Sequence, residues 1–155
     1  MEYDVVIVGA GPAGLTTAIK LKQLDPNLNV CILEKGSEVG AHILSGNVFE
    51  TKALDELIPN WKNEGAPVKT KVSKEKFLFL GKNSSLSWPT WLLPSVQKNH
   101  KNYIVSLANL CRWLAEQAEK LGVEIFPGFP ASEVLYNQDG SIKGVATLDM
   151  GLDKD

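Results

Sequence analysis

Apolar runs divide the start of the chain into a strand, a helix and a second strand. Residues 3–8 (YDVVIV) are nearly all apolar and rich in β-branched side chains, which predicts a strand buried on both faces of a parallel sheet. Residues 12–24 carry apolar or small side chains at helical spacing. Residues 30–33 predict a second strand that ends at Glu34. This order predicts a right-handed βαβ unit over residues 3–34.

The rest of the chain predicts one long helix among shorter elements. Apolar residues recur at helical spacing from Ser106 to Leu121, and Gly122 is placed to end that helix. The shorter elements expected are a helix over residues 51–58, short strands and turns over 65–100, a strand over 123–126, and a hairpin with strands at 133–136 and 142–147. Residues 151–155 add no closing element. We therefore expect one partial α/β domain over residues 1–155, incomplete at its C-terminal end.

Composition and charge exclude several kinds of site. A chain of 155 residues is long enough to bury a core, and a net charge of −2 offers no basic surface to nucleic acid. Cys31 and Cys111 lie far apart without metal-ligand spacing, so we expect two core cysteines and no metal site. No stretch approaches the ~20 apolar residues that span a bilayer. A strand that starts at residue 3 leaves no room for a signal peptide, so we expect neither segment.

The junction of the first strand and helix carries a glycine motif. Gly9-Ala10-Gly11-Pro12-Ala13-Gly14 matches the GxGxxG pattern. The first glycine permits a tight turn, the second lets the backbone approach a pyrophosphate, and the third lets helix and strand pack closely. A proline in the first helical turn costs no hydrogen bond, and the helix N-terminus offers free N–H groups to phosphates. We predict that a dinucleotide binds here; glycines that serve only a tight turn are the alternative.

Glu34 supplies a second part of this predicted site. It lies twenty residues after Gly14, where the second strand ends beside the adenosine ribose of a bound dinucleotide. A carboxylate at that place accepts hydrogen bonds from the ribose hydroxyls and repels a 2′-phosphate, which disfavours NADP. A surface acid at a strand end is the alternative. The fingerprint is common to NAD and FAD proteins and does not select between them.

Longer blocks of sequence carry a resemblance to a known family. GAGPAG, then LEKG, Gly40 and Ser45-Gly46, resemble the glutathione-reductase-like FAD superfamily. The blocks EKGSEVGAHILSG, LIPNWKNEGAP, NHKNYIVSL, EQAEKLGVEIFPG and DGSIKGVAT resemble the N-terminal part of the electron transfer flavoprotein-ubiquinone oxidoreductase family. The likeness covers essentially the whole chain. It implies a Rossmann-type FAD-binding fold with an attached β-hairpin region, in an N-terminal fragment of a longer protein.

The family likeness also implies an activity. Such proteins pass electrons from reduced electron transfer flavoprotein through FAD and a four-cysteine [4Fe–4S] cluster to ubiquinone at a membrane surface. The likeness implies that FAD is held by the glycine motif, Glu34 and Lys35, with Ser45 and Gly46 near the flavin. No catalytic side chain is required, because the cofactor carries the redox chemistry. The cluster ligands are expected only in the C-terminal part beyond this chain.

The family likeness also implies that the full protein associates with a membrane, and two alternatives for the function of the chain stay open. The full protein is expected to be monotopic, on the inner or cytoplasmic membrane. Residues 39–61 are a candidate contact, although packing under a loop is favoured for their apolar set: Val39, Ile43, Leu44, Phe49, Leu54, Leu57, Ile58 and Trp61. Trp88 and Trp91 are candidates for lining a hydrophobic groove, although burial against the sheet is favoured. The alternatives for the whole chain are another FAD-dependent oxidoreductase, such as a geranylgeranyl-reductase-like enzyme, and a truncated fragment without activity.

Overall fold

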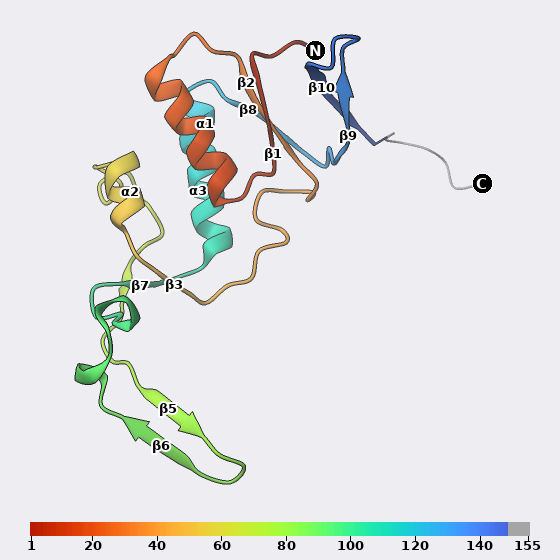
Figure 1. Ribbon diagram of the computed structural model, residues 1–155. Helices are drawn as coiled ribbons and strands as arrows, with labels where there is room; N and C mark the ends of the chain where they lie inside the picture. Colours follow the sequence, from red (N-terminus) through yellow and green to blue (C-terminus); the bar gives the residue numbers. More distant parts are fainter. Residues whose placement is uncertain (149–155) are drawn as a thin grey trace. The chain divides into compact units, whose positions relative to one another are not determined.

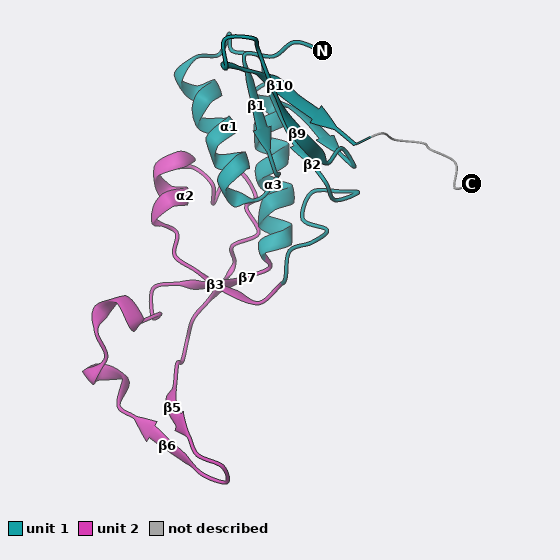
Figure 2. Cartoon of the chain, turned by 45° about the vertical axis from the view of Figure 1, so that its right-hand side comes forward, with its two compact units in different colours: residues 1–44, 107–155 teal, residues 45–106 magenta. Residues whose placement is uncertain are grey.

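The computed structural model describes residues 1–148. The chain divides into two compact units: unit 1 comprises Met1–Leu44 and Leu107–Asp155, and unit 2 comprises Ser45–Ser106 (Figure 2). The expectation of one domain over residues 1–155 stays a prediction. The expectation that residues 151–155 add no closing element lies outside the described residues.

A three-stranded parallel sheet forms the centre of unit 1. Its strands are β1 (Val5–Val8), β2 (Val30–Glu34) and β8 (Glu124–Pro127), in the order β1-β2-β8. Two helices, α1 (Pro12–Leu24) and α3 (Leu107–Lys120), pack on each other and on the sheet (Figure 1). The strand, helix and parallel strand predicted over residues 3–34 are therefore confirmed, with the first strand starting two residues later than predicted.

Both helices bury one face, as their sequence spacing predicts. The buried apolar side chains of α1 are Leu15, Ala18 and Ile19, and those of α3 include Leu110, Cys111, Leu114 and Ala118. The polar side of α3 is exposed, with Arg112 pairing with Glu38 at 2.9 Å. Gly122 ends α3 in a backbone conformation with φ of +82°, which favours glycine.

The burial of β1 differs from the prediction. Val6 and Val8 are exposed, Val8 by 61%, although a strand buried on both faces was expected. Ile7 points toward α1, because its Cγ2 atom lies 3.2 Å from the place of a Cβ added at Gly14. Val6, one residue away, must then face the other side of the pleated strand. Because β1 is an edge strand of the described sheet and α1 covers one of its faces, the alternate side chains stay open to solvent.

The hairpin predicted near the C-terminus is confirmed. Its strands are β9 (Ala131–Tyr136) and β10 (Ile142–Thr147), which pair antiparallel. Gly140 lies in the turn with φ of +83°. The hairpin is attached to unit 1 after β8.

Unit 2 is built from short elements. A small antiparallel sheet has the order β3-β7-β4, where β3 is Asn47–Phe49, β7 is Tyr103–Val105 and β4 is Thr70–Lys71. The predicted short helix is α2 (Lys52–Leu57). Further along, β5 (Phe77–Leu80) and β6 (Ser85–Trp88) form a hairpin that the 3₁₀ turns η1 (Thr90–Leu92) and η2 (Ser95–Gln97) follow. No helix within residues 1–148 is long and apolar enough to cross a membrane.

The apolar side chains of the middle segment divide between buried and exposed. Within the set predicted over residues 39–61, Val39, Leu54, Ile58 and Trp61 are buried, which confirms packing for these four. The expected burial of Trp88 and Trp91 is wrong, because both are exposed, Trp91 by 74%. Trp88 packs edge-on against Phe79 at 5.9 Å within the β5–β6 hairpin. A two-stranded hairpin without a covering layer cannot bury both of its faces.

A hydrogen-bonded tryptophan forms the core of unit 2. Trp61 lies edge-on to Tyr103 at 6.1 Å between ring centroids. Its Nε1–H donates to Asp55 Oδ1 at 2.7 Å, and the Thr51 hydroxyl donates to Asp55 Oδ2 at 2.9 Å. The bond from Trp61, with a smaller effect from Thr51, lowers the pKa of Asp55 below its ordinary value of 3.8.

We expect this carboxylate to make the stability of unit 2 depend on pH. A pKa that is lower in the folded than in the unfolded chain stabilises the fold above the unfolded pKa. That stabilisation is lost as the pH falls from about 4 through the folded pKa of Asp55. Melting temperatures of wild type and Asp55→Asn, measured from pH 6 to pH 2.5, should converge at the acidic end. A difference that stays constant with pH would contradict this role of Asp55.

Candidate functional site: the corner between β1 and α1

Two glycines between β1 and α1 leave open space beside the backbone. Gly9 has φ of +100°, a conformation that favours glycine, and its N–H donates to Leu33 O at 2.7 Å. A Cβ added at Gly9 or at Gly11 would meet no atom within 4 Å. The space beside these two residues is therefore open, as the approach of a pyrophosphate requires.

Gly14 has a different environment. A Cβ added there would overlap the carbonyl oxygen of Gly9 and lie 3.2 Å from Ile7 Cγ2. The third glycine of the motif thus permits close packing of α1 on β1, as predicted from the sequence.

The start of α1 is suited to an anion. Gly11 is the N-cap residue, no side-chain hydrogen bond caps the helix, and Pro12 occupies its first turn. The first turn carries no acidic residue. Uncapped N–H groups and the partial positive charge of the helix N-terminus attract negatively charged groups, and nothing acidic in this turn opposes them.

Glu34 lies beside this corner at the end of β2. Its Oε2 accepts a hydrogen bond from Ala10 N–H at 2.8 Å, and its Oε1 accepts one from Gly36 N–H at 2.7 Å. The structure therefore brings Glu34 to the glycine motif, and its contact with an adenosine ribose stays a prediction. The bond to Ala10 was not predicted, because the fingerprint spacing places the acid near a ribose and carries no signal for a contact with the loop.

Three further residues are predicted to belong to the site, namely Lys35, Ser45 and Gly46. Lys35 is exposed next to Glu34. Ser45 and Gly46 are exposed residues of unit 2, and Gly46 has φ of +86°. Their place near a flavin stays a prediction.

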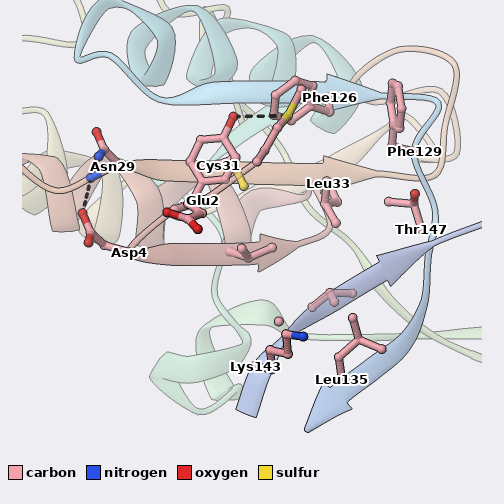
Figure 3. A pocket seen from close by; sticks show the side chains of 15 residues that line it. Glu2, Asp4, Asn29, Cys31, Leu33, Phe126, Phe129, Leu135, Lys143 and Thr147 are labelled. Atoms are coloured by element: carbon pink, nitrogen blue, oxygen red, sulfur yellow. Dashed lines mark hydrogen bonds between the residues drawn. The ribbon is translucent and has the colours of Figure 1, made fainter. Parts of the chain in front are cut away.

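A cavity of about 980 Å³ lies elsewhere in unit 1 (Figure 3). Its walls include Val6 and Leu33 of the sheet and Leu135, Lys143 and Val145 of the hairpin. None of Gly9 to Gly14 lines it. Glu2, Tyr3 and Asp4 also contribute to its lining. The glycine corner and this cavity are therefore separate features of unit 1.

Neither cysteine has the character of a reactive or metal-binding thiol. Both are free and buried. Burial raises the pKa of Cys111 to about 11, with a smaller effect from Glu34, and burial raises the pKa of Cys31. Within residues 1–148, no three His, Cys, Asp or Glu side chains gather as metal ligands. The cysteines are core residues, as expected from their isolation in the sequence.

The fold is similar to that of several proteins of known structure, and one family model matches part of the chain. The model of the Thi4 family matches residues 1–57. A geranylgeranyl bacteriochlorophyll reductase-like protein from Thermoplasma acidophilum superposes with a TM-score of 0.66 at 22% identity, over 94% of this chain and 34% of its own. A myxobacterial chondrochloren halogenase, described as FAD-dependent, gives 0.60 at 18% identity, over 94% and 32%. The chain therefore shares the α/β fold of these FAD-dependent and reductase-like proteins.

Much closer relatives are found in one named group. Electron transfer flavoprotein-ubiquinone oxidoreductase from Dictyostelium discoideum is 58% identical over 158 residues, covering 99% of this chain and 26% of the relative. The probable enzyme of that name from Acinetobacter baylyi is 55% identical, covering 100% and 28%. The chain is thus homologous over its whole length to a segment of the electron transfer flavoprotein-ubiquinone oxidoreductases, which confirms the resemblance found in the sequence. It spans about a quarter of the length of these curated relatives.

Proposed function

We propose that this chain is the FAD-binding segment of an oxidoreductase that passes electrons from reduced electron transfer flavoprotein to ubiquinone. The observation that carries the proposal is the open backbone beside Gly9 and Gly11, next to an uncapped helix N-terminus. The names of relatives above 50% identity support the identity of the electron donor and acceptor.

The glycine corner fits the diphosphate of FAD. Main-chain N–H groups of Gly11, Ala13 and Gly14 at the start of α1 would bind the phosphates, in the space that a Cβ at Gly9 or Gly11 would fill, because the N–H groups of Gly9 and Ala10 already donate to Leu33 and Glu34. Glu34 would accept hydrogen bonds from the adenosine ribose, with Lys35 beside it. Ser45 and Gly46 would lie toward the flavin.

The bound flavin would supply the redox chemistry of this protein. The residues of this chain would bind and orient it, and none of them needs to transfer a proton. An iron–sulfur cluster requires four thiolates, whereas the two cysteines here are buried and apart. We therefore assign the [4Fe–4S] cluster of the proposed enzyme to sequence beyond this chain.

The experiment that tests the proposed activity uses the longer polypeptide that contains this segment. Reduced electron transfer flavoprotein should bleach the flavin of the purified protein, and a soluble ubiquinone analogue should restore its colour. The sequence after residue 155 should contain four clustered cysteines. A flavin that dithionite bleaches and the analogue reoxidises, but that reduced electron transfer flavoprotein does not bleach, would instead favour another FAD-dependent oxidoreductase.

We also propose that the β5–β6 hairpin, with η1 and η2, provides the membrane contact of this enzyme. Its apolar side chains are exposed on both faces: Phe77, Leu78, Phe79, Leu80, Leu86, Trp88, Trp91, Leu92 and Val96. In Figure 2 the hairpin extends from the rest of unit 2. Lys74, Lys76 and Lys82 accompany it and are exposed. Apolar and tryptophan side chains next to lysines suit the surface of an anionic membrane.

The hairpin is expected to control binding to lipid vesicles. Binding can be measured by co-sedimentation with vesicles of phosphatidylcholine and phosphatidylglycerol. A double variant, Leu80→Ser with Trp91→Ser, should bind at least about tenfold more weakly, because it lacks two apolar side chains that would be buried in the lipid. The control double variant is Leu24→Ser with Ile142→Ser. These control side chains are 72% and 70% exposed, against 79% and 74% for Leu80 and Trp91. An equal loss in both double variants would contradict the assignment of the hairpin.

A further inference from the structure

The carboxylate of Glu34 joins two segments of backbone in unit 1. One oxygen accepts from Ala10 N–H at 2.8 Å and the other from Gly36 N–H at 2.7 Å. The adjacent Gly9 N–H donates to Leu33 O at 2.7 Å. Two successive residues of the glycine motif are therefore tied to two successive residues at the end of β2.

These bonds have a clear physical consequence for the loop. Hydrogen bonds to a carboxylate are shorter and stronger than those between neutral groups. Ala10 is only 1% exposed, so its N–H would remain unsatisfied if the carboxylate were removed. A segment with three glycines in six residues has large conformational freedom, and each fixed bond reduces that freedom before a ligand arrives.

Gly36 makes the second bond possible. A Cβ at that position would lie 3.1 Å from Glu34 Oε1 and 3.1 Å from Glu38 O, closer than ordinary van der Waals contact. Gly36 itself is buried. The turn after β2 thus folds tightly over the carboxylate and fixes its orientation toward Ala10.

We infer that Glu34 is a positioning residue for the glycine motif, in addition to its proposed contact with the ribose. It holds residues 9 and 10 in the conformation that leaves the backbone open to a diphosphate. The inference rests on the proposed FAD site. A carboxylate offers about four acceptor positions, and the two backbone N–H groups leave room for ribose hydroxyls. One side chain therefore serves both the loop and the ligand.

Amide hydrogen exchange of the chain without ligand tests the positioning role directly. In Glu34→Ala, the amides of Ala10 and Gly36 should exchange about 10- to 100-fold faster than in wild type, the effect of losing a charge-assisted hydrogen bond. Amides of the β9–β10 hairpin should keep their rates. The charge-matched control is Glu116→Ala, on the exposed face of α3. Unchanged rates at Ala10 and Gly36, or one common factor for all amides of unit 1, would overturn the inference.

Glu34→Gln keeps the test valid if the alanine variant does not fold. An amide side chain has one acceptor and one donor end, so it can satisfy only one of the two backbone N–H groups. Faster exchange should then appear at Ala10 or at Gly36. Protection of both amides at wild-type rates would overturn the inference.

Two nucleotides separate positioning from ribose binding. With ADP, Glu34→Ala should weaken binding through both roles. With 2′,3′-dideoxy-ADP, which lacks the ribose hydroxyls, Glu34→Ala should still weaken binding by about tenfold, because the loop is no longer held. An effect confined to ADP would overturn the positioning role. If wild type binds neither nucleotide, the proposed FAD site fails, and the exchange rates of Ala10 and Gly36 still decide the inference.

Discussion

Gly14→Ala is expected to lower the free energy of unfolding of the chain by about 3 kcal/mol or more. The new Cβ would overlap Gly9 O and crowd Ile7 Cγ2. Relief requires α1 to move away from β1, or the corner at Gly9 to lose its bond to Leu33 O. Overpacking at a site without free volume costs about 1 to 3 kcal/mol, and more where backbone atoms are involved. Urea denaturation followed by far-UV circular dichroism measures the difference.

Gly11→Ala is the matched control for Gly14→Ala. The same methyl group added at Gly11 meets no atom within 4 Å. Gly11 has φ of −79° and ψ of −179°, an extended conformation that alanine adopts without strain. Its unfolding free energy should stay within about 0.5 kcal/mol of wild type or rise slightly. Equal stability of the two variants would show that α1 does not depend on a close approach at Gly14.

Gly11→Val is expected to weaken FAD binding by at least about 100-fold while the chain stays folded. The branched side chain would occupy the open space that the pyrophosphate needs. A loss of that size corresponds to about 2.7 kcal/mol, the scale of a steric conflict with a bound group. Titration of flavin fluorescence against the purified variants measures the affinity, and circular dichroism verifies the fold.

Gly11→Ala provides a graded comparison for the valine variant. Its smaller side chain should reduce FAD affinity less than valine does, because it fills less of the same space. Wild-type affinity in Gly11→Val would refute the position assigned to the pyrophosphate.

The sequence predicts local features of this fold well. The βαβ unit follows from apolar spacing within 34 residues, and the end of α3 follows from Gly122. The open space beside Gly11 and the close packing at Gly14 follow from a fingerprint whose positions have fixed geometric meaning. Such features depend on near neighbours in the chain, which are visible in one sequence.

Features that depend on distant segments could not be predicted in the same way. Ala10 and Glu34 are 24 positions apart, and their hydrogen bond requires β1 and β2 to be paired in a particular register. The β3-β7-β4 sheet joins strands that lie far apart in the sequence and are only two or three residues long.

Aromatic residues were the other source of error. Trp88 and Trp91 are apolar, and apolar side chains are usually buried, yet both lie on a hairpin with no covering layer among the described residues. The pattern of apolar residues does not reveal whether another layer of the fold covers the face on which they lie. Val6 and Val8 on β1 were misjudged for the same reason.

The proposed FAD site requires that backbone amides at the start of α1, those of Gly11, Ala13 and Gly14, bind the diphosphate of FAD. Its most direct measurement is the change in the amide ¹H–¹⁵N spectrum of the chain during titration with FAD. We predict the largest shifts at Gly11, Ala13 and Gly14, with smaller ones at Gly9, at Ala10 and near Glu34. No saturable shift, or shifts confined to the cavity residues Leu135, Lys143 and Val145, would contradict it.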